Sequence, residues 1–252
     1  MVNPSLCEPF HKLLGVQRSE DVVRELEQLA RAVYPYEAGA IIRPDGLIMP
    51  VDNIAEEPKE DFELPCADYH LLKPGCIFWH SHPKGPNHPS FDDQKSQLHG
   101  NNGWAITARD PETETWDFFC WGDQLQPPSL VGRSFRHYVT DCFSVIRHEF
   151  KTRGLHVPDC PRPKQWWKQD GIGHTILDHL QRLDCPVHYE ADFRPQPGDV
   201  ALMQVRSRTV NHLAVLTEGF EFLHHLEERL SAREPAEEYM HYVRGWLRYA
   251  GA

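Results

Sequence analysis

Two histidines and an aspartate in the first half of the chain have the spacing of a metal site. His80 and His82 stand on either side of one residue at the end of an apolar run, and Asp93 follows after a short loop. Two imidazoles at a strand end can face one ion, and a carboxylate from the next helix completes the three protein ligands of a catalytic zinc site. Zinc held in this way leaves one position for water and lowers the pKa of that water to about 7. A nearby carboxylate, for which Glu37 is the candidate, then acts as general base toward a peptide carbonyl.

The residues that follow the His-x-His pair distinguish it from a chance match. In a chain with 16 histidines among 252 residues, such a pair is expected about once by chance. Requiring Ser90 and Asp93 at fixed later positions lowers that expectation roughly 400-fold. The pattern therefore predicts a metal site. We interpret His88 as a loop residue, and His70 and His99 as surface residues.

One cysteine and two histidines in the second half predict a nucleophilic site. Cys142 falls in the first turn of a predicted helix, where unpaired N–H groups and the helix dipole favour thiolate over thiol. His212 opens an apolar strand and His224 lies on the next strand, so His224 can hydrogen-bond His212 and fix its tautomer. Nucleophile, base and orienting residue would form a triad. His225 is a second candidate for the orienting residue. The alternative is structural, because a single buried cysteine usually packs as a small hydrophobe and a strand histidine as a core residue.

Periodicity predicts the elements that would position the first site. Apolar residues recur at helical spacing over 19–33, and Ser19 is the expected cap of this helix. The other elements expected in this half are a hairpin within 37–51, a buried strand at 76–81, a helix at 92–100 capped by Ser90 or Asp92, and a hairpin formed by 104–110 and 115–121.

The second half has its own set of elements. Residues 122–132 contain two adjacent prolines and no periodicity, so we expect them to link two domains. The elements expected beyond this linker are a helix at 140–154 capped by Thr140 or Asp141, a helix at 174–183, and antiparallel strands at 198–205, 211–217 and 220–226. Helices and strands are mixed throughout, so the predicted fold class is α+β with two domains, 1–121 and 133–252.

Composition excludes several classes of protein. Hydrophobic residues make up 40% and charged residues 25%, a globular balance that argues against long disorder. With 26 basic against 37 acidic residues the net charge is −11, which repels phosphate backbones, so nucleic acid is not an expected partner. No apolar run reaches the roughly 18 residues of a membrane span. The first residues lack a basic region followed by a hydrophobic core, so we expect a cytoplasmic protein.

The cysteines do not suggest a disulfide framework. Their number is odd, and none are arranged as C-x-x-C. We expect most of them to be reduced and buried. The cysteines given a purely structural role are Cys7, Cys66, Cys76, Cys120, Cys160 and Cys185.

The first half resembles the JAMM (MPN) metallopeptidases over about residues 19–121. The resemblance is carried by the segment from His80 through Ser90 to Asp93, and by Glu37 in the run Tyr-Glu-Ala-Gly. It implies a JAMM/MPN fold in which His80, His82 and Asp93 bind zinc, Ser90 helps to hold the oxyanion and Glu37 is the base. The family often has Cys-Gly after the alanine, whereas this chain has Gly39 and Ala40, so the local strand packing differs.

The second half resembles the NlpC-type cysteine peptidases, a papain-like α+β fold, over about residues 133–230. The matching segments are Asp-Cys-Phe-Ser at 141–144, Pro-Gly-Asp-Val at 197–200, and the histidines 212 and 224. The resemblance implies Cys142 as nucleophile, His212 as base and His224 as the third member. Peptidoglycan stem peptides are the implied substrate, often cut after a D-γ-glutamyl residue. The usual D-C-S-G becomes D-C-F-S here, which changes the pocket beside the thiol.

The order of the two halves resembles the K-type tail-tip assembly proteins of lambda-like phages. This resemblance implies a bifunctional peptidase in tail assembly or cell-wall penetration. The first domain would cut a peptide or isopeptide bond, in a neighbouring tail-tip protein with a ubiquitin-like fold. It also implies that the protein acts in the host cytoplasm during assembly and at the virion tail tip, which reaches the periplasm at infection.

Two other functions stay open at this point. In the first, the protein is a structural tail component whose sites serve only binding. In the second, the metallopeptidase is the main activity, as a processing or deconjugating enzyme, and the second half targets the wall. Metal content, thiol labelling and a Cys142→Ala variant distinguish these possibilities.

Overall fold

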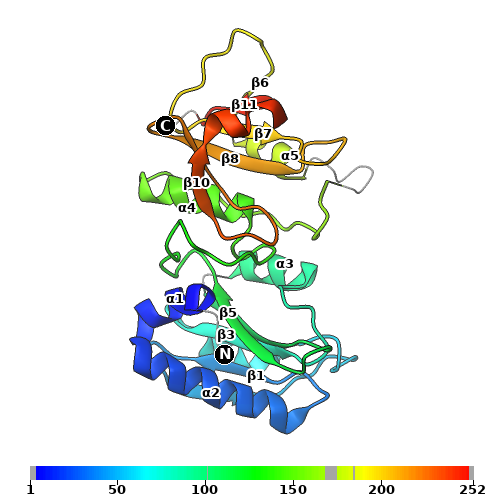
Figure 1. Ribbon diagram of the computed structural model, residues 1–252. Coiled ribbons are helices and arrows are strands. Elements are labelled where there is room, and N and C mark those ends of the chain that lie inside the picture. The colour runs from blue at the N-terminus through cyan, green and yellow to red at the C-terminus, as the bar shows by residue number, and fades with distance from the viewer. Residues whose placement is uncertain (1–3, 101, 168–174, 184, 250–252) are drawn as a thin grey trace. The chain divides into compact units, whose positions relative to one another are not determined.

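A computed structural model describes residues 4–100, 102–167, 175–183 and 185–249. It divides the chain into two compact units, Met1–Pro128 and Ser129–Ala252. The division falls inside the stretch 122–132. Each unit contains both helices and a sheet, so the α+β class is confirmed (Figure 1). No helix among the described residues is long and apolar enough to span a membrane.

The first unit is a five-stranded sheet with helices α1 and α2 packed on one face. Its strand order is β2-β1-β3-β4-β5, in which only β3 and β4 are parallel, and α3 forms the connection between them. The elements are α1 (Pro4–Leu14), α2 (Val16–Val33), β1 (Gly39–Ile42), β2 (Ile48–Val51), the 3-10 helix η1 (Cys66–Leu71), β3 (Ile77–His82), α3 (Phe91–His99), β4 (Gly103–Arg109) and β5 (Trp116–Trp121).

The two faces of this sheet bury different side chains. Trp79 and Phe118 belong to the core that includes α1 and α2, while Phe78 belongs to a smaller cluster on the other face. Side chains alternate along a strand, so His80 and His82 share the face of Phe78 rather than that of the helices. The alternation of β3 therefore directs both imidazoles away from the main core.

The second unit is a six-stranded antiparallel sheet of order β10-β9-β8-β7-β11-β6. Helix α4 packs on β8 and β9 (Figure 1). The elements are α4 (Cys142–Thr152), α5 (Thr175–Arg182), β6 (Val187–His188), β7 (Val200–Met203), β8 (His212–Thr217), β9 (Glu221–His224), β10 (Ala232–Pro235), the 3-10 helices η2 (Ala236–Glu238) and η3 (Met240–Tyr242), and β11 (Val243–Leu247).

Some boundaries differ from the sequence prediction. The prediction of Ser19 as a helix cap is wrong, because α2 begins at Val16 and Ser19 lies inside it, with its hydroxyl donating to the Val16 carbonyl at 2.7 Å. Residue 174, where a helix was expected to begin, lies outside the described residues. The helix at the N-terminus and strands β6, β10 and β11 were not predicted.

Candidate active sites

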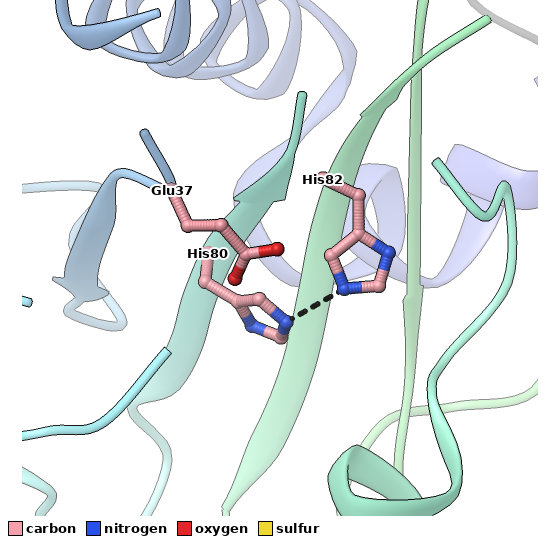
Figure 2. Close-up of side chains that lie close together, drawn as sticks. All are labelled: Glu37, His80 and His82. Atoms are coloured by element: carbon pink, nitrogen blue, oxygen red, sulfur yellow. Dashed lines mark hydrogen bonds between the residues drawn. The ribbon is translucent and has the colours of Figure 1, made fainter. Parts of the chain in front are cut away.

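The first candidate site is built on β3. The Nε2 atoms of His80 and His82 lie 3.0 Å apart, and both side chains are buried (Figure 2). Nδ1 of His82 is 2.8 Å from the Pro86 carbonyl, to which it can only donate. That hydrogen bond leaves the Nε2 lone pair of His82 facing His80, the tautomer that a metal ligand needs.

Helix α3 delivers the aspartate through its N-terminal cap. The Ser90 hydroxyl accepts from the Asp93 N–H at 3.0 Å, and Asp93 Oδ2 accepts from the Ser90 N–H at 2.7 Å. This capping box fixes the carboxylate at the start of the helix. As a result, Asp93 oxygens lie 3.1 Å from Nε2 of His80 and 3.4 Å from Nε2 of His82. Ser90 thus holds the carboxylate and also lines the cavity at this site.

Glu37 brings a second carboxylate to the histidine pair. It precedes β1, is buried, and has an oxygen within 4.8 Å of ligand nitrogens of both His80 and His82 (Figure 2). Burial raises the pKa of Glu37, and the two histidines oppose that shift. In Asp93, burial acts in the same direction, but His80 and His82 hold the pKa well below its usual value. The structure thus brings together all five residues predicted for this site.

This donor set fits a zinc ion. Zinc binds imidazole nitrogens at about 2.0–2.1 Å in tetrahedral geometry, which places two such nitrogens about 3.3 Å apart. The observed separation of 3.0 Å between His80 and His82 is close to that value. Asp93 would supply the third ligand, and a cavity of about 90 Å³ lined by these residues gives room for water and a reacting group.

The Gly39 position explains how the strand differs from the JAMM pattern. A Cβ added at Gly39 would lie 2.1 Å from the Phe62 ring. Phe62 packs in that space, with its ring centroid 6.0 Å from that of His80. The missing side chain on β1 therefore makes room for an aromatic wall beside the histidines.

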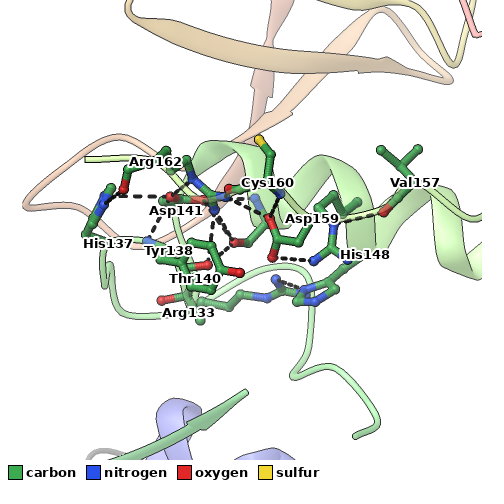
Figure 3. Close-up of polar contacts among 12 residues, drawn as sticks. Arg133, His137, Tyr138, Thr140, Asp141, His148, Val157, Asp159, Cys160 and Arg162 are labelled. Carbon is green, nitrogen blue, oxygen red and sulfur yellow. Dashed lines mark hydrogen bonds and ion pairs between the residues drawn. The ribbon is translucent and has the colours of Figure 1, made fainter. Parts of the chain in front are cut away.

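The second candidate site begins at the N-terminus of α4. Asp141 caps the helix, because its Oδ1 accepts from the Ser144 N–H at 2.9 Å. Arg162, fully buried, donates to both carboxylate oxygens of Asp141 at 2.8 Å, and Figure 3 shows this network of polar contacts. This Arg162–Asp141 ion pair, here called the clamp, fixes the first turn of α4 and with it Cys142.

The thiol of Cys142 does not have the low pKa expected from its helix position. Burial, and then the charge of Asp141, raise its pKa to about 12, and backbone hydrogen bonds to Leu213 and Phe143 only partly oppose this. The expectation that the helix start would favour thiolate is therefore wrong, because desolvation outweighs the dipole. Cys142 needs a base to become a nucleophile.

A base is present in the same cavity. Cys142 and His212 both line a cavity of about 590 Å³. Burial, and then the neighbouring His224, lower the pKa of His212 well below its usual value, so its imidazole is neutral and able to accept a proton. Nε2 of His212 lies 3.0 Å from Nδ1 of His224, as the triad requires. His225 instead contacts the Arg229 carbonyl at 3.0 Å, which leaves His224 as the candidate for the third position.

Sequence reasoning missed one acidic residue at this site. Glu234 lies 2.7 Å from Nε2 of His224, and no motif pointed to it. Among the other predictions, most of the cysteines are free and buried as expected, and Cys66 is exposed. No disulfide joins any cysteines in the part of the chain that the structure describes.

A thiol, a neutral imidazole and a second imidazole behind it are the groups of a cysteine hydrolase. Residues 117–245 match the model of the NlpC/P60 family, and the chain belongs to that family. It is 33% identical over 156 residues, 62% of this chain and 71% of the relative, to tail tip assembly protein K of Escherichia phage lambda. It is 31% identical over 225 residues, 82% of this chain and 84% of the relative, to tail tip assembly protein K of Escherichia phage N15.

Proposed function

We propose that the second unit is a cysteine endopeptidase that cleaves peptidoglycan stem peptides. The observation that carries this proposal is the shared cavity of Cys142 and His212, with His224 hydrogen-bonded behind the base. His212 takes the thiol proton as Cys142 Sγ attacks the peptide carbonyl, and the protonated imidazole then gives the proton to the leaving amine. Water hydrolyses the resulting thioester and regenerates the thiol.

One cation on the cavity wall is placed to meet a carboxylate of the substrate. Basic and acidic residues both line the cavity, and two of its cations are paired, Lys164 with Glu227 and Arg229 with Glu234, whereas no ion pair is described for Arg206. Arg206 is exposed, and its backbone adopts a left-handed conformation with φ of 51°. A γ-linked glutamyl residue keeps a free α-carboxylate, for which a guanidinium is the best-matched partner. A stem peptide cut beside such a residue therefore fits this wall.

We further propose that the first unit is a zinc-dependent peptidase or isopeptidase of the JAMM type. His80, His82 and Asp93 would hold the zinc, which supplies a polarised water when bound. Glu37 would accept the proton of that water, and Ser90 would stabilise the oxyanion. A groove of about 490 Å³ adjoins the zinc cavity and shares Phe62, Phe78, Ser96 and Trp104 with it. Its aromatic and aliphatic walls suit an apolar residue of an extended peptide.

The relatives support a proposal for the biological setting. Two phage proteins named for tail tip assembly are similar to this chain over most of their length. We therefore assign the protein to the assembly of a phage tail tip, where the thiol site would open peptidoglycan. The zinc site would process a neighbouring tail protein, for which a ubiquitin-like fold is the candidate.

One experiment tests both assignments. The purified protein, its Cys142→Ala variant and its His80→Ala variant are incubated with peptidoglycan and with candidate tail proteins, and the products are identified by mass spectrometry. Cys142→Ala should abolish release of muropeptides, and Cys185→Ala, another buried thiol of the same unit, should not. Release that survives in Cys142→Ala rules out the thiol as nucleophile.

The same experiment addresses the structural alternative. A tail component with sites that only bind would release no product from either substrate. Zinc content and labelling of Cys142 then show whether the sites are intact. A protein that holds zinc and has a reactive thiol but no activity toward any substrate favours the binding role.

A further inference from the structure

The His212–His224 pair continues across the sheet to a third strand. Ala214 of β8 and Ala232 of β10 both stand opposite His224 in the register. Residues two positions along from these, His212 and Glu234, therefore lie on the same face as His224 and diagonal to it. The two links measure 3.0 Å from His212 to His224 and 2.7 Å from His224 to Glu234.

The carboxylate at the end of this row determines where each proton sits. An ionised carboxylate only accepts hydrogen bonds, so Nε2 of His224 must carry a hydrogen. In neutral His224 the Nδ1 atom is then an acceptor, and it accepts from Nε2–H of His212. That leaves Nδ1 of His212 unprotonated, as a base toward the thiol must be.

Glu234 is itself held in place. The Tyr239 hydroxyl donates to Oε2 of Glu234 at 2.5 Å, and the Arg229 guanidinium donates to Oε1 at 2.8 Å. Burial would raise the pKa of Glu234, but Tyr239 and His224 together hold it below its usual value. The carboxylate is therefore ionised and has a fixed orientation.

We propose that Glu234 is a positioning residue that extends the catalytic triad to a chain of four, Cys142–His212–His224–Glu234. This inference rests on the proposed role of Cys142 as the nucleophile. Without Glu234, the proton of His224 can move to Nδ1 and be donated to His212. The proton of His212 would then occupy its own Nδ1, where the imidazole cannot accept the thiol proton.

The test measures the reactivity of the thiol and needs no substrate. The full chain is treated with iodoacetamide at pH 7, and peptide mass spectrometry gives the alkylation rate of Cys142 relative to the exposed Cys66. We expect Glu234→Ala to lower this relative rate by about 10- to 100-fold, as for the loss of a charge-assisted hydrogen bond. Glu234→Asp should restore part of the rate.

Two further variants make the test specific. Glu190→Ala removes an exposed glutamate that pairs with His188 at 3.6 Å in the same unit, away from the thiol cavity, and should leave the rate unchanged. Tyr239→Phe removes one hydrogen bond, from an uncharged donor, to the same carboxylate and should lower the rate about 2- to 10-fold. It also tests the proposal if Glu234→Ala does not fold.

The outcomes separate this inference from the proposed function. If Glu234 only stabilised the fold, its loss would loosen the site and expose the buried thiol, so that the Cys142 rate would stay the same or rise, which overturns the inference. An unchanged rate in Glu234→Ala and Tyr239→Phe also overturns it, while the thiol keeps its role. If the wild-type Cys142 reacts no faster than in a His212→Ala variant, the activated nucleophile and the four-residue chain both fail.

Discussion

Cys142 depends on its base more than a surface thiol would, because its own surroundings oppose ionisation. Burial raises its pKa to about 12. Without His212, the thiolate fraction at pH 7 would therefore be far smaller than that of an ordinary cysteine with a pKa of about 8.5. We expect His212→Ala to make Cys142 react with iodoacetamide more slowly than Cys66 at pH 7. Its rate should then rise about tenfold per pH unit and level off only near pH 12.

The control for this prediction is His241→Ala. His241 lines the same cavity but is not one of the four residues of the proposed chain. That variant should keep the wild-type rate. A Cys142 that stays as reactive in His212→Ala as in the wild type would show that its ionisation does not depend on the imidazole.

Glu37 and Asp93 offer two carboxylates to one pair of histidines, and a substitution distinguishes their roles. Glu37→Gln should retain about one zinc per chain and lose hydrolysis of the metallopeptidase substrate, because the amide cannot accept a proton from water. Metal analysis by mass spectrometry and product analysis on the same sample check the two parts. Glu56→Gln, in an exposed acidic loop, is the matched control. Loss of zinc in Glu37→Gln would identify Glu37 as a ligand instead.

The residues that sequence analysis identified are those whose relation is local or repeats a known spacing. His80 and His82 share a strand face, and Asp93 belongs to a capping box that begins at Ser90. Glu234 was missed because its contact with His224 depends on the register of β9 against β10. Nothing in the sequence near Glu234 specifies that register, so the contact needed the structure.

At the scale of elements, the start of α4 depends on a buried ion pair. Burial would raise the pKa of Asp141, but the Arg162 guanidinium overcomes this and holds it well below its usual value. The unfolded chain, with an ordinary aspartate pKa of about 3.9, thus takes up the proton first as the pH falls. The pair therefore contributes stability above about pH 4, and that contribution is lost progressively below it.

We expect Asp141→Asn to destabilise the second unit by about 3 kcal/mol at pH 7, because Arg162 loses a partner in a buried site. Hydrogen exchange of α4 amides in increasing urea measures this. The variant should also lose less stability than the wild type between pH 5 and pH 3. Asp21→Asn breaks an exposed pair with Arg24 and should cost less than about 1 kcal/mol. An Asp141→Asn effect as small as that control would contradict a structural role for the clamp.

The contact of Phe62 with β1 gives a second prediction at this scale. Gly39→Ala places a methyl group where the Phe62 ring now lies, and should destabilise the first unit by about 1–3 kcal/mol. Adding Phe62→Ala should remove most of that extra cost, so that the two changes are coupled by about 1 kcal/mol in a double-mutant cycle of urea unfolding. Gly100→Ala, where the nearest atom is 4.0 Å away, is the control. Additive effects at Gly39 and Phe62 would argue against the contact.

Elements with clear periodicity were predicted, and those that depend on tertiary packing were not. The helix over 19–33 and the strands around His80 and His212 followed from their apolar spacing. The first helix contains Pro9, a poor helix former, and packs through Phe10 against Phe118 at 5.1 Å between ring centroids. Strand β10, with the sequence AREP, lacks apolar alternation and forms by pairing with β9. Long-range contacts thus define both elements.

At the scale of the whole molecule, the two sites belong to different compact units, each with its own core. The residues proposed to hold zinc come from β3 and α3, and the proposed base, Glu37, lies just ahead of β1, all in the first unit. The four residues of the proposed catalytic chain come from α4, β8, β9 and β10 of the second unit. Substitutions at sites that share no partners are expected to act independently.

This independence is testable in the intact chain. His80→Ala should abolish zinc binding. It should leave the iodoacetamide rate of Cys142 within about twofold of the wild type, because the described hydrogen bonds that link His212, His224 and Glu234 all lie within the second unit. Conversely, Cys142→Ala should leave the zinc content unchanged. His99→Ala, an exposed histidine in the first unit, is the control for zinc loss. A large change in Cys142 reactivity on loss of zinc would mean that the two sites are coupled and do not act independently.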